Sequence, residues 1–293
     1  MKKRLIKKSE EVGVKNQVEH EKKIGSEKVT KTTGRVNGGD LKYAFLPVIT
    51  ILAFLLIWQL LVMYGVLPDR IIAKPTDVFV TMFKKFTDTS PDGATLLENI
   101  FVSLQVSLLG LLIAIAIGVP LGLLMGWYPS IDRLVRPLFE LIRPIPPIAW
   151  IPLTILWIGI GVRARAMIIF FAAFVPCVIN SYTGIKSTSM VHINVAKTFG
   201  ATNFKTFLKV GIPSAMPMAF AGMRIALGNS WSTLIAAELL AANAGLGYMI
   251  MMGRQFVRPD IIILGMITIG FLGYLLTRIF ARIEDIVVRW RTL

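Results

Sequence analysis

Six long apolar runs constrain the fold of this chain more than any other feature of its sequence. A helix needs about 20 mostly apolar residues to cross the hydrocarbon core of a bilayer. Charged residues or clusters of Pro and Gly, which end helices, separate the runs from one another. The predicted spans cover roughly residues 43–67, 99–127, 134–160, 166–185, 213–240 and 260–281. The sequence therefore predicts an all-α integral membrane protein with six transmembrane helices.

The composition supports this class and bears on the partners of the chain. Of the 293 residues, 55% are hydrophobic, and the formal net charge is +15. In a soluble protein such a charge would favour nucleic-acid binding. Here the Lys and Arg residues lie in the N-terminal segment and between the apolar runs, so the positive-inside rule accounts for them. We therefore expect a lipid bilayer, and no nucleic acid, as a partner.

The N-terminal segment, residues 1–42, differs in composition from the rest of the chain. It contains twelve Lys or Arg, six Asp or Glu and few large apolar residues. Such a segment cannot bury enough apolar surface to offset the entropy lost on ordering. We expect a disordered basic tail at 1–42, followed by a transmembrane domain at 43–293.

The orientation of the spans follows from the basic residues on alternate sides. One side receives the N-terminal tail, the 128–136 turn, the 186–212 loop and the C-terminal segment, with 22 Lys or Arg between them. The other side receives eight, namely Arg70, Lys74, Lys84, Lys85, Arg163, Arg165, Arg254 and Arg258. Because basic residues accumulate on the cytoplasmic side, both termini and the 186–212 loop are predicted to be cytoplasmic.

The third apolar run contains four prolines within nine residues. Proline removes a backbone donor and prevents regular helical hydrogen bonding. Interrupted backbone at membrane depth is tolerated where it is buried in protein or lines a water-filled cavity. The run therefore predicts pathway-lining residues, namely Arg143, Pro144, Pro146, Pro147 and Trp150. An alternative to a pathway role is that the prolines only bend the helix, and that the Arg143 side chain extends to the lipid headgroups or pairs with Glu140.

The fifth run carries two ionisable residues, Arg224 and Glu238. Charges inside a membrane segment are costly and usually face the interior of the bundle or a cavity. The two residues are about 21 Å apart along a helix, so they cannot pair with each other. Both are candidate pathway residues, and for Glu238 a structural pair between helices is an open alternative.

Small residues form a stripe along the second run. Gly110, Gly118, Gly122 and Gly126 are spaced by multiples of four residues. Residues at this spacing share one helix face, and small side chains there let two backbones approach closely. The stripe predicts a tight helix contact.

Residues 190–217 form a polar, basic and amphipathic insertion between two apolar runs, which is typical of a docking surface. The insertion resembles the cytoplasmic coupling loop of permease subunits in binding-protein-dependent ABC importers. In that loop a Glu-Ala-Ala triplet precedes a glycine and an Ile/Leu-Pro pair. Here Asn194 replaces the Glu of the triplet, and Val195 replaces an Ala. The coupling residues implied are Asn194, Val195, Ala196, Gly200, Ala201, Phe204, Ile212 and Pro213.

The resemblance extends to other parts of residues 95–291. The Pro-rich run, the Arg224 region and the turn at Gly245-Leu246-Gly247 resemble the nitrate, sulfonate, taurine and bicarbonate subgroup of these permeases. The resemblance implies a type I importer fold in a bacterial cytoplasmic membrane and a permease homodimer. It also implies separate ATPase subunits and an extracytoplasmic binding protein that delivers a small, anionic solute.

The chain itself carries no phosphate-binding loop of the form G-x-x-x-x-G-K-[ST]. We therefore expect no enzymatic activity and no cofactor in this chain, with ATP bound by the partner subunit. No metal site is expected either.

Three alternatives remain open. A permease of the same family could carry a small nutrient that is not an anion. A secondary transporter would need a pair of interrupted spans in repeated halves, and the sequence shows a single interrupted run. A membrane-embedded enzyme would need clustered catalytic groups, whereas the runs contain scattered single charges.

Overall fold

A computed structural model describes residues 45–288 of the chain, except for the side chain of Ala241. The predicted disordered tail at 1–42 lies outside the described residues. The described part contains helices and connecting segments, and no β-strand. The chain divides between Leu55 and Leu56 into two units, Met1–Leu55 and Leu56–Leu293.

Helix α3, Leu46–Met63, corresponds to the first predicted span and contains no charged residue. In the first unit, the Thr50 hydroxyl donates to the Leu46 carbonyl oxygen at 2.9 Å, which satisfies this polar group within the helix. In the second unit, Gln59 hydrogen-bonds to Thr76 at the start of α4, Pro75–Lys84. Proline at the first helical position suits the start of α4 because its missing N–H needs no partner there.

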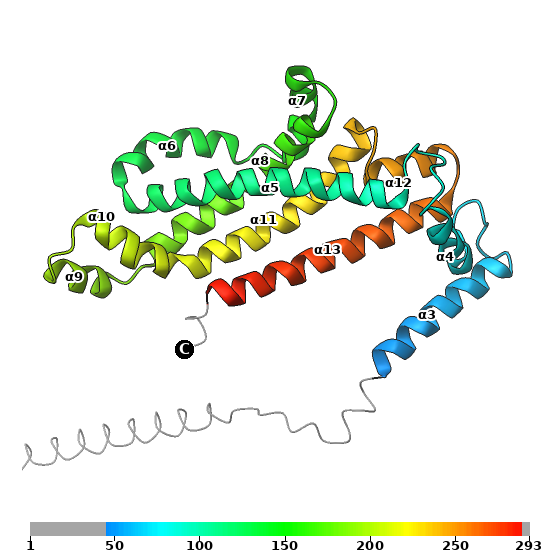
Figure 1. Ribbon diagram of the computed structural model, residues 1–293, viewed down its shortest axis with the longest axis horizontal. Helices are drawn as coiled ribbons and strands as arrows, with labels where there is room; N and C mark the ends of the chain where they lie inside the picture. Colours follow the sequence, from blue (N-terminus) through cyan, green and yellow to red (C-terminus); the bar gives the residue numbers. More distant parts are fainter. Residues whose placement is uncertain (1–44, 289–293) are drawn as a thin grey trace, which may run out of the picture. The chain divides into compact units, whose positions relative to one another are not determined.

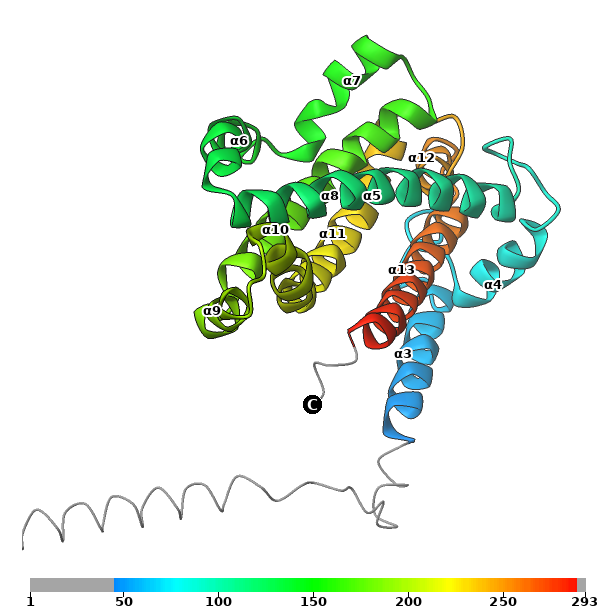
Figure 2. The ribbon, with the colours of Figure 1, turned by 60° about the vertical axis from the view of Figure 1, so that its left-hand side comes forward.

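Three long helices form the centre of the second unit. They are α5 (Leu96–Trp127), α8 (Val162–Lys186) and α11 (Ile212–Ala241). Helix α8 packs against both α5 and α11 along most of its length (Figures 1 and 2). Helix α5 begins with a capping box, in which the Thr95 side chain accepts from the Glu98 N–H and the Glu98 carboxylate accepts from the Thr95 N–H.

The predicted glycine stripe of α5 packs against α8, as expected. A methyl group at Gly110 would lie 2.7 Å from the carbonyl oxygen of Ala166, and one at Gly126 would lie 2.9 Å from the Cβ of Ile185. The two helix backbones therefore contact each other directly. Glycines make a second close contact between α8 and α11, where a methyl group at Gly184 would lie 2.8 Å from the Ala215 carbonyl oxygen.

The third predicted span is interrupted where the prolines cluster. It consists of α6 (Pro129–Ile142), the 3₁₀ turn η1 (Pro147–Trp150) and α7 (Ile151–Ile158). The two halves are bent by 86°. The predicted break is thus confirmed. Five described helices are long and apolar enough to cross a membrane, and counting this bent pair as one span gives six.

The last part of the chain contains a helix that the sequence pattern did not predict. A tight turn was expected near residues 243–248, and α12 (Leu246–Gln255) follows directly from it. The long α13 (Pro259–Val287) covers the final predicted span. Helix α12 packs on α13 and α11, at the end of the unit opposite α9 and α10 (Figures 1 and 2).

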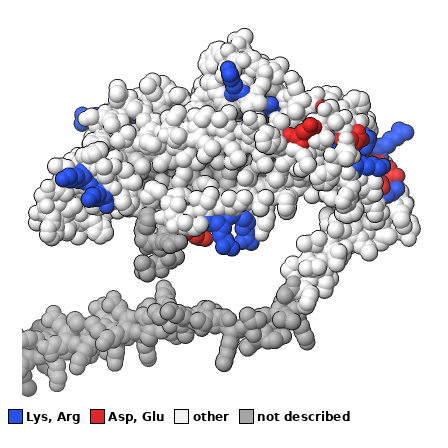
Figure 3. Space-filling view, in the orientation of Figure 1, with Lys and Arg blue, Asp and Glu red and all other residues white. Residues whose placement is uncertain are grey.

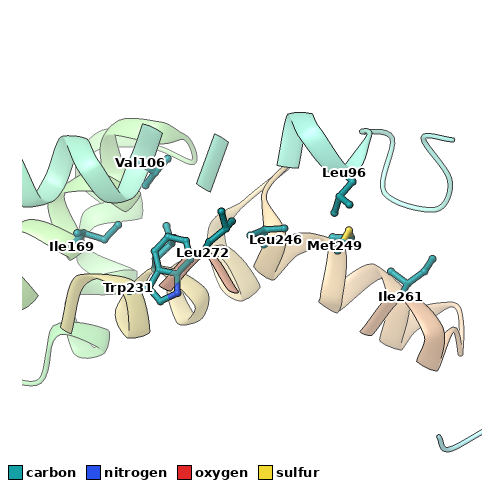
Figure 4. Packing of buried hydrophobic residues seen from close by; sticks show 9 residues of the cluster. Leu96, Val106, Ile169, Trp231, Leu246, Met249, Ile261 and Leu272 are labelled. Atoms are coloured by element: carbon teal, nitrogen blue, oxygen red, sulfur yellow. The ribbon is translucent and has the colours of Figure 1, made fainter. Parts of the chain in front are cut away.

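One hydrophobic cluster joins these helices. It draws residues from α5, α8, α11, α12 and α13, and Figure 4 shows Trp231 beside Leu272 within it. The indole N–H of Trp231 donates to the carbonyl oxygen of Ile269 at 3.1 Å, so this buried polar group is satisfied. In the view of Figure 3, the middle of the unit shows no charged side chain, and the charges lie toward its ends and edges.

Gly122 provides a test of the close contact between α5 and α8. A methyl group there would press on the Val178 carbonyl oxygen and lie 2.9 Å from the Cβ of Ser181. Gly122→Ala is expected to lower the free energy of unfolding by about 1–3 kcal/mol through overpacking. The matched control is Gly270→Ala in α13, where a methyl group would meet no atom within 4 Å. Equal thermal unfolding midpoints for the two purified variants would contradict the contact.

Candidate functional site

The predicted coupling loop at 186–212 is largely helical. It contains α9 (Met190–Thr198), α10 (Asn203–Thr206) and a π-helical turn, η2 (Phe207–Gly211). The Thr202 side chain caps α10 by accepting from the Lys205 N–H. Helix α11 then begins at Ile212, with Pro213 in its first turn. The loop forms one end of the second unit (Figure 1).

Gly200 ends α9 in a left-handed backbone conformation, with φ at +77°. The Gly200 N–H donates to the Lys197 carbonyl oxygen, and the Ala201 N–H donates to that of Ala196. This arrangement satisfies carbonyl groups at the helix end and favours glycine. A methyl group at Gly200 would meet no atom within 4 Å. The chain therefore needs glycine at this position for its backbone angle and not for lack of space.

The loop exposes a row of apolar side chains, which we call the coupling surface: Val191, Val195, Phe199 and Phe204. Phe199 is 87% exposed, although a large aromatic side chain gains free energy from burial. Phe207, in the same loop, is buried against Trp127 and Tyr128 with ring centroids 5.5 and 5.7 Å away. It holds the loop to the bundle and does not belong to the coupling surface.

The candidate coupling residues lie together on this loop with different exposures. Asn194, Val195, Gly200 and Phe204 are exposed, whereas Ala196, Ala201, Ile212 and Pro213 are half-buried.

All charged residues of the loop are basic. It carries Lys186, Lys197, Lys205 and Lys209, and the chain has no Asp or Glu between Glu140 and Glu238. The face in Figure 3 accordingly shows Lys or Arg, and no acidic side chain, at this end.

Arg143 lies at the C-terminal end of α6, beside the proline break. Its guanidinium is 3.6 Å from the Glu140 carboxylate, as the i,i+3 alternative predicted. Arg143 and Tyr182 line a pocket of about 160 Å³ between α5, α6 and α8. Within the break, Trp150 stacks on Phe171 with ring centroids 4.3 Å apart. Pro144, Pro146 and Pro147 lie in and beside the non-α segment that joins the two halves of the span.

Arg224 forms an ion pair with Glu284 of α13. The side chain of Arg224 is half-exposed and that of Glu284 is buried. The pair therefore joins α11 to the far end of the last helix. The sequence singled out Arg224 but gave no partner for it, because Glu284 lies 60 residues further along.

Glu238 is fully buried at the other end of α11. One carboxylate oxygen accepts from the Gly247 N–H at 2.8 Å, and the Ser103 hydroxyl donates to the carboxylate at 2.8 Å. The Arg165 guanidinium lies 3.6 Å away. Glu238 and Arg165 thus form a structural pair between α11 and α8, which was the alternative predicted for Glu238. The carboxylate also satisfies a free N–H in the first turn of α12. The structure does not bring Glu238, Arg224 and Arg143 together.

The turn before α12 is held by buried side chains from three helices, which we call the turn cradle: Asn99, Ser103, Arg165 and Glu238. Asn99 accepts from the Gly245 N–H at 2.8 Å, and Ser103 accepts from the Leu246 N–H at 2.9 Å. Arg165 donates to the Ala244 carbonyl oxygen at 3.1 Å. The backbone polar groups of four successive residues, 244–247, thus form hydrogen bonds with side chains of α5, α8 and α11.

The cradle continues to the loop before α5. The Lys85 ammonium donates to the Asp92 carboxylate and to the carbonyl oxygens of Ser90 and Ala94. Asp92 in turn accepts from the Asn99 amide at 2.6 Å. Sequence reasoning counted Lys85 and Arg165 as loop charges and passed over Asn99 and Ser103. Polar residues in an otherwise apolar run were the signal that could have identified the latter two.

Helix α11 has one exposed stripe. Ser214, Met218, Ile225, Gly228, Asn229 and Ser232 are exposed at successive turns of this helix. Its other faces pack on neighbouring helices. Polar groups in a membrane-spanning helix rarely face lipid and usually face protein or a water-filled cavity. The stripe therefore marks a surface for another chain or for water.

Glu238 provides a test of the turn cradle. Glu238→Ala is expected to lower the free energy of unfolding by about 3–5 kcal/mol, because it leaves a buried guanidinium without its partner. The matched control is Glu140→Ala, which breaks the half-exposed pair with Arg143 and should cost about 1 kcal/mol or less. Thermal unfolding of the purified variants measures the difference. A similar loss of stability in both variants would show that the buried turn cradle contributes no more to the free energy of unfolding than the half-exposed Glu140–Arg143 pair.

Comparison with known proteins relates this geometry to a family. The sequence profile of the family described as binding-protein-dependent transport system inner membrane component matches residues 118–292. A putative ABC transporter permease protein of Methanocaldococcus jannaschii is 39% identical, over 80% of this chain and 88% of the relative. The taurine transport system permease protein TauC of Escherichia coli is 34% identical, over 78% of this chain and 82% of the relative. The putative aliphatic sulfonates transport permease protein SsuC of Bacillus subtilis is 30% identical, over 92% and 94%.

The fold has a solved counterpart. A structure of the MetNI methionine ABC transporter in an inward-facing conformation contains a chain with a TM-score of 0.51 and 21% sequence identity. The similarity covers 63% of this chain and 95% of the other, and at this identity it concerns the fold alone. The fold and the sequence profile agree, and the chain belongs to the family of binding-protein-dependent transport system inner membrane components.

Proposed function

We propose that this chain is the permease subunit of an ABC importer and provides the membrane pathway for a small anion. Separate ATPase subunits bind the 186–212 loop, and an extracytoplasmic binding protein delivers the solute at the end that carries α12. ATP is bound by the partner subunit, and the chain itself catalyses no reaction. Family membership and the exposed coupling surface together support this function.

The coupling surface is the single observation that carries the proposal. A loop whose Phe199 and Phe204 rings point into solvent loses free energy unless another protein covers them. The loop is also rigid enough to transmit movement, because α9 ends in a defined turn at Gly200 and Phe207 fixes the loop to the bundle. Its lysines favour a partner with acidic groups around the contact.

The exposed stripe of α11 supports a homodimer with the pathway between two copies. Asn229 and Ser232 in this stripe offer polar groups that a solute could pass, and the helix runs the length of the span. Arg224 lies at the edge of the stripe with half of its side chain exposed. Arg143, next to the proline break, supplies a second cationic group.

The proposed substrate class rests on the relatives and on these arginines. The two bacterial relatives described above are named for taurine and for aliphatic sulfonates, which are small molecules with a sulfonate group. Guanidinium groups bind such oxyanions through paired hydrogen bonds. The pathway residues proposed for this chain remain Arg143, Pro144, Pro146, Pro147, Trp150, Arg224 and Glu238, with Glu238 acting through the turn cradle.

We infer that the protein resides in the cytoplasmic membrane of a bacterium with both termini in the cytoplasm. Basic residues support this orientation, with 22 on the proposed cytoplasmic side and eight on the other. The structure strengthens the asymmetry, because two of those eight, Lys85 and Arg165, are buried and paired with carboxylates. Residues that are neutralised inside the protein do not act as loop charges.

Uptake of a radiolabelled sulfonate tests the proposed function. The chain is expressed with a candidate ATPase and a candidate binding protein from the same genome, in cells that lack their own sulfonate uptake. Depleting ATP while the ion gradients are clamped is expected to abolish uptake, and collapsing the gradients at constant ATP is expected to leave it intact. The reverse pattern would indicate a secondary transporter. ATP-dependent uptake confined to a neutral solute would indicate a permease of this family with another substrate.

A further inference from the structure

A pocket of about 260 Å³ lies between the coupling helix α9 and the end of the helix bundle. It is bounded by the ends of α5 and α8 and by residues of the loop. Its lining includes Trp127, Lys186, Thr188, Ile193, Lys197 and Asn203. The coupling surface is not part of this lining, so the pocket lies behind the part of the loop that is proposed to contact the ATPase.

The charges that line the pocket are all positive. Lys186 comes from the end of α8 and Lys197 from α9, and among the described residues neither forms an ion pair. The Lys186 ammonium rests 5.6 Å from the centroid of the Tyr182 ring. No Asp or Glu lines the pocket, and the sequence has none from residue 141 to residue 237. Two ammonium groups at one pocket without a carboxylate attract an anion.

Hydrogen-bond donors complete the lining. The Thr188 hydroxyl is buried and has no hydrogen-bond partner among the described residues. A buried hydroxyl without a partner is unfavourable, and such groups often mark an unseen ligand or ion. The Asn203 amide supplies further donors at the same pocket. The lining thus offers donors from lysine, threonine and asparagine side chains.

We propose that this pocket binds a tetrahedral oxyanion, either a free phosphate or sulfate ion or the phosphate of an anionic lipid. Its oxygens accept hydrogen bonds from Lys186, Lys197 and the Thr188 hydroxyl. The ion joins α9 to α8 and fixes the coupling helix against the bundle. Occupancy therefore changes how firmly the coupling loop is held, and this goes beyond the proposed transport function.

Equilibrium binding of radiolabelled sulfate and phosphate tests the site directly. The full chain is placed in nanodiscs of phosphatidylcholine, and chloride at equal ionic strength serves as the reference anion. Saturable binding is expected, with the affinity lowered about tenfold by Lys186→Gln and by Lys197→Gln, because each removes a charge-assisted hydrogen bond. Thr188→Val, which keeps the shape but removes the hydroxyl, is expected to lower the affinity several-fold.

Lys205→Gln and Lys209→Gln are the matched controls, since both lysines belong to the same loop but do not line the pocket. They are expected to leave the affinity unchanged. If all four Lys variants lost the same affinity for the anion, the effect would come from the overall positive charge of the loop and not from a site. That result would overturn the proposal. Measuring the helical content of each variant separates a lost site from a misfolded loop.

A second set of nanodiscs containing phosphatidylglycerol distinguishes the two sources of the oxyanion. If the lipid headgroup occupies the pocket, the anionic lipid displaces bound sulfate and copurifies with the chain, and Lys186→Gln abolishes the copurification. If the natural ligand is a free ion, sulfate binding is the same in both lipids. Absence of sulfate, phosphate and lipid binding would overturn the proposal.

Discussion

The close contact between α5 and α8 is the constraint on which the rest of the second unit depends. Apolar side chains gain little by leaving lipid for a protein interior of similar polarity, so helices in a membrane associate through dispersion contacts at short range. The glycines of α5 let its backbone touch the carbonyl oxygens and Cβ atoms of α8. Helix α11 then packs on the other side of α8, again through glycines. The remaining helices and the two functional ends are placed by this three-helix centre.

Polar interactions are concentrated at the two ends of that centre and differ in kind. At the α12 end, the turn cradle satisfies consecutive backbone groups with fully buried side chains. At the α9 end, the loop carries unpaired lysines and exposed aromatic rings. A satisfied buried network makes one conformation unique, whereas exposed unpaired groups are available to partners. The contrast assigns a rigid, self-contained role to the α12 end and a docking role to the α9 end.

The sequence predicted much of this architecture because its strongest signals are local. Five of the spans are continuous apolar helices, the proline cluster interrupts the third span, and the glycine spacing marks the contact between α5 and α8. The coupling residues were found from their resemblance to a family pattern, and the structure places them on one loop. The positive φ of Gly200, with free space around it, shows that glycine is needed there for the backbone conformation.

Features that depend on distant pairs were missed or left open. For Glu238, the sequence left a pathway role and a structural pair between helices both open, because its partners Ser103 and Gly247 lie 135 and nine residues away in the chain. Lys85 and Arg165 resembled loop charges because burial cannot be read from residue type at the edge of an apolar run. Helix α12 was not predicted because its ten residues are too short to show a clear period against a glycine-rich turn.

The proposed coupling role requires that the 186–212 loop lies in the cytoplasm and docks the ATPase through its exposed aromatic side chains. The most direct measurement uses a single cysteine in place of the exposed Thr198, next to Phe199, in a chain whose only native cysteine, the buried Cys177, is replaced by Ala. The account predicts that a membrane-impermeant maleimide labels this cysteine in inverted vesicles but not in right-side-out vesicles. It also predicts that the bound ATPase protects the cysteine from labelling. Labelling from the outside, or equal labelling with and without the ATPase, would contradict the account.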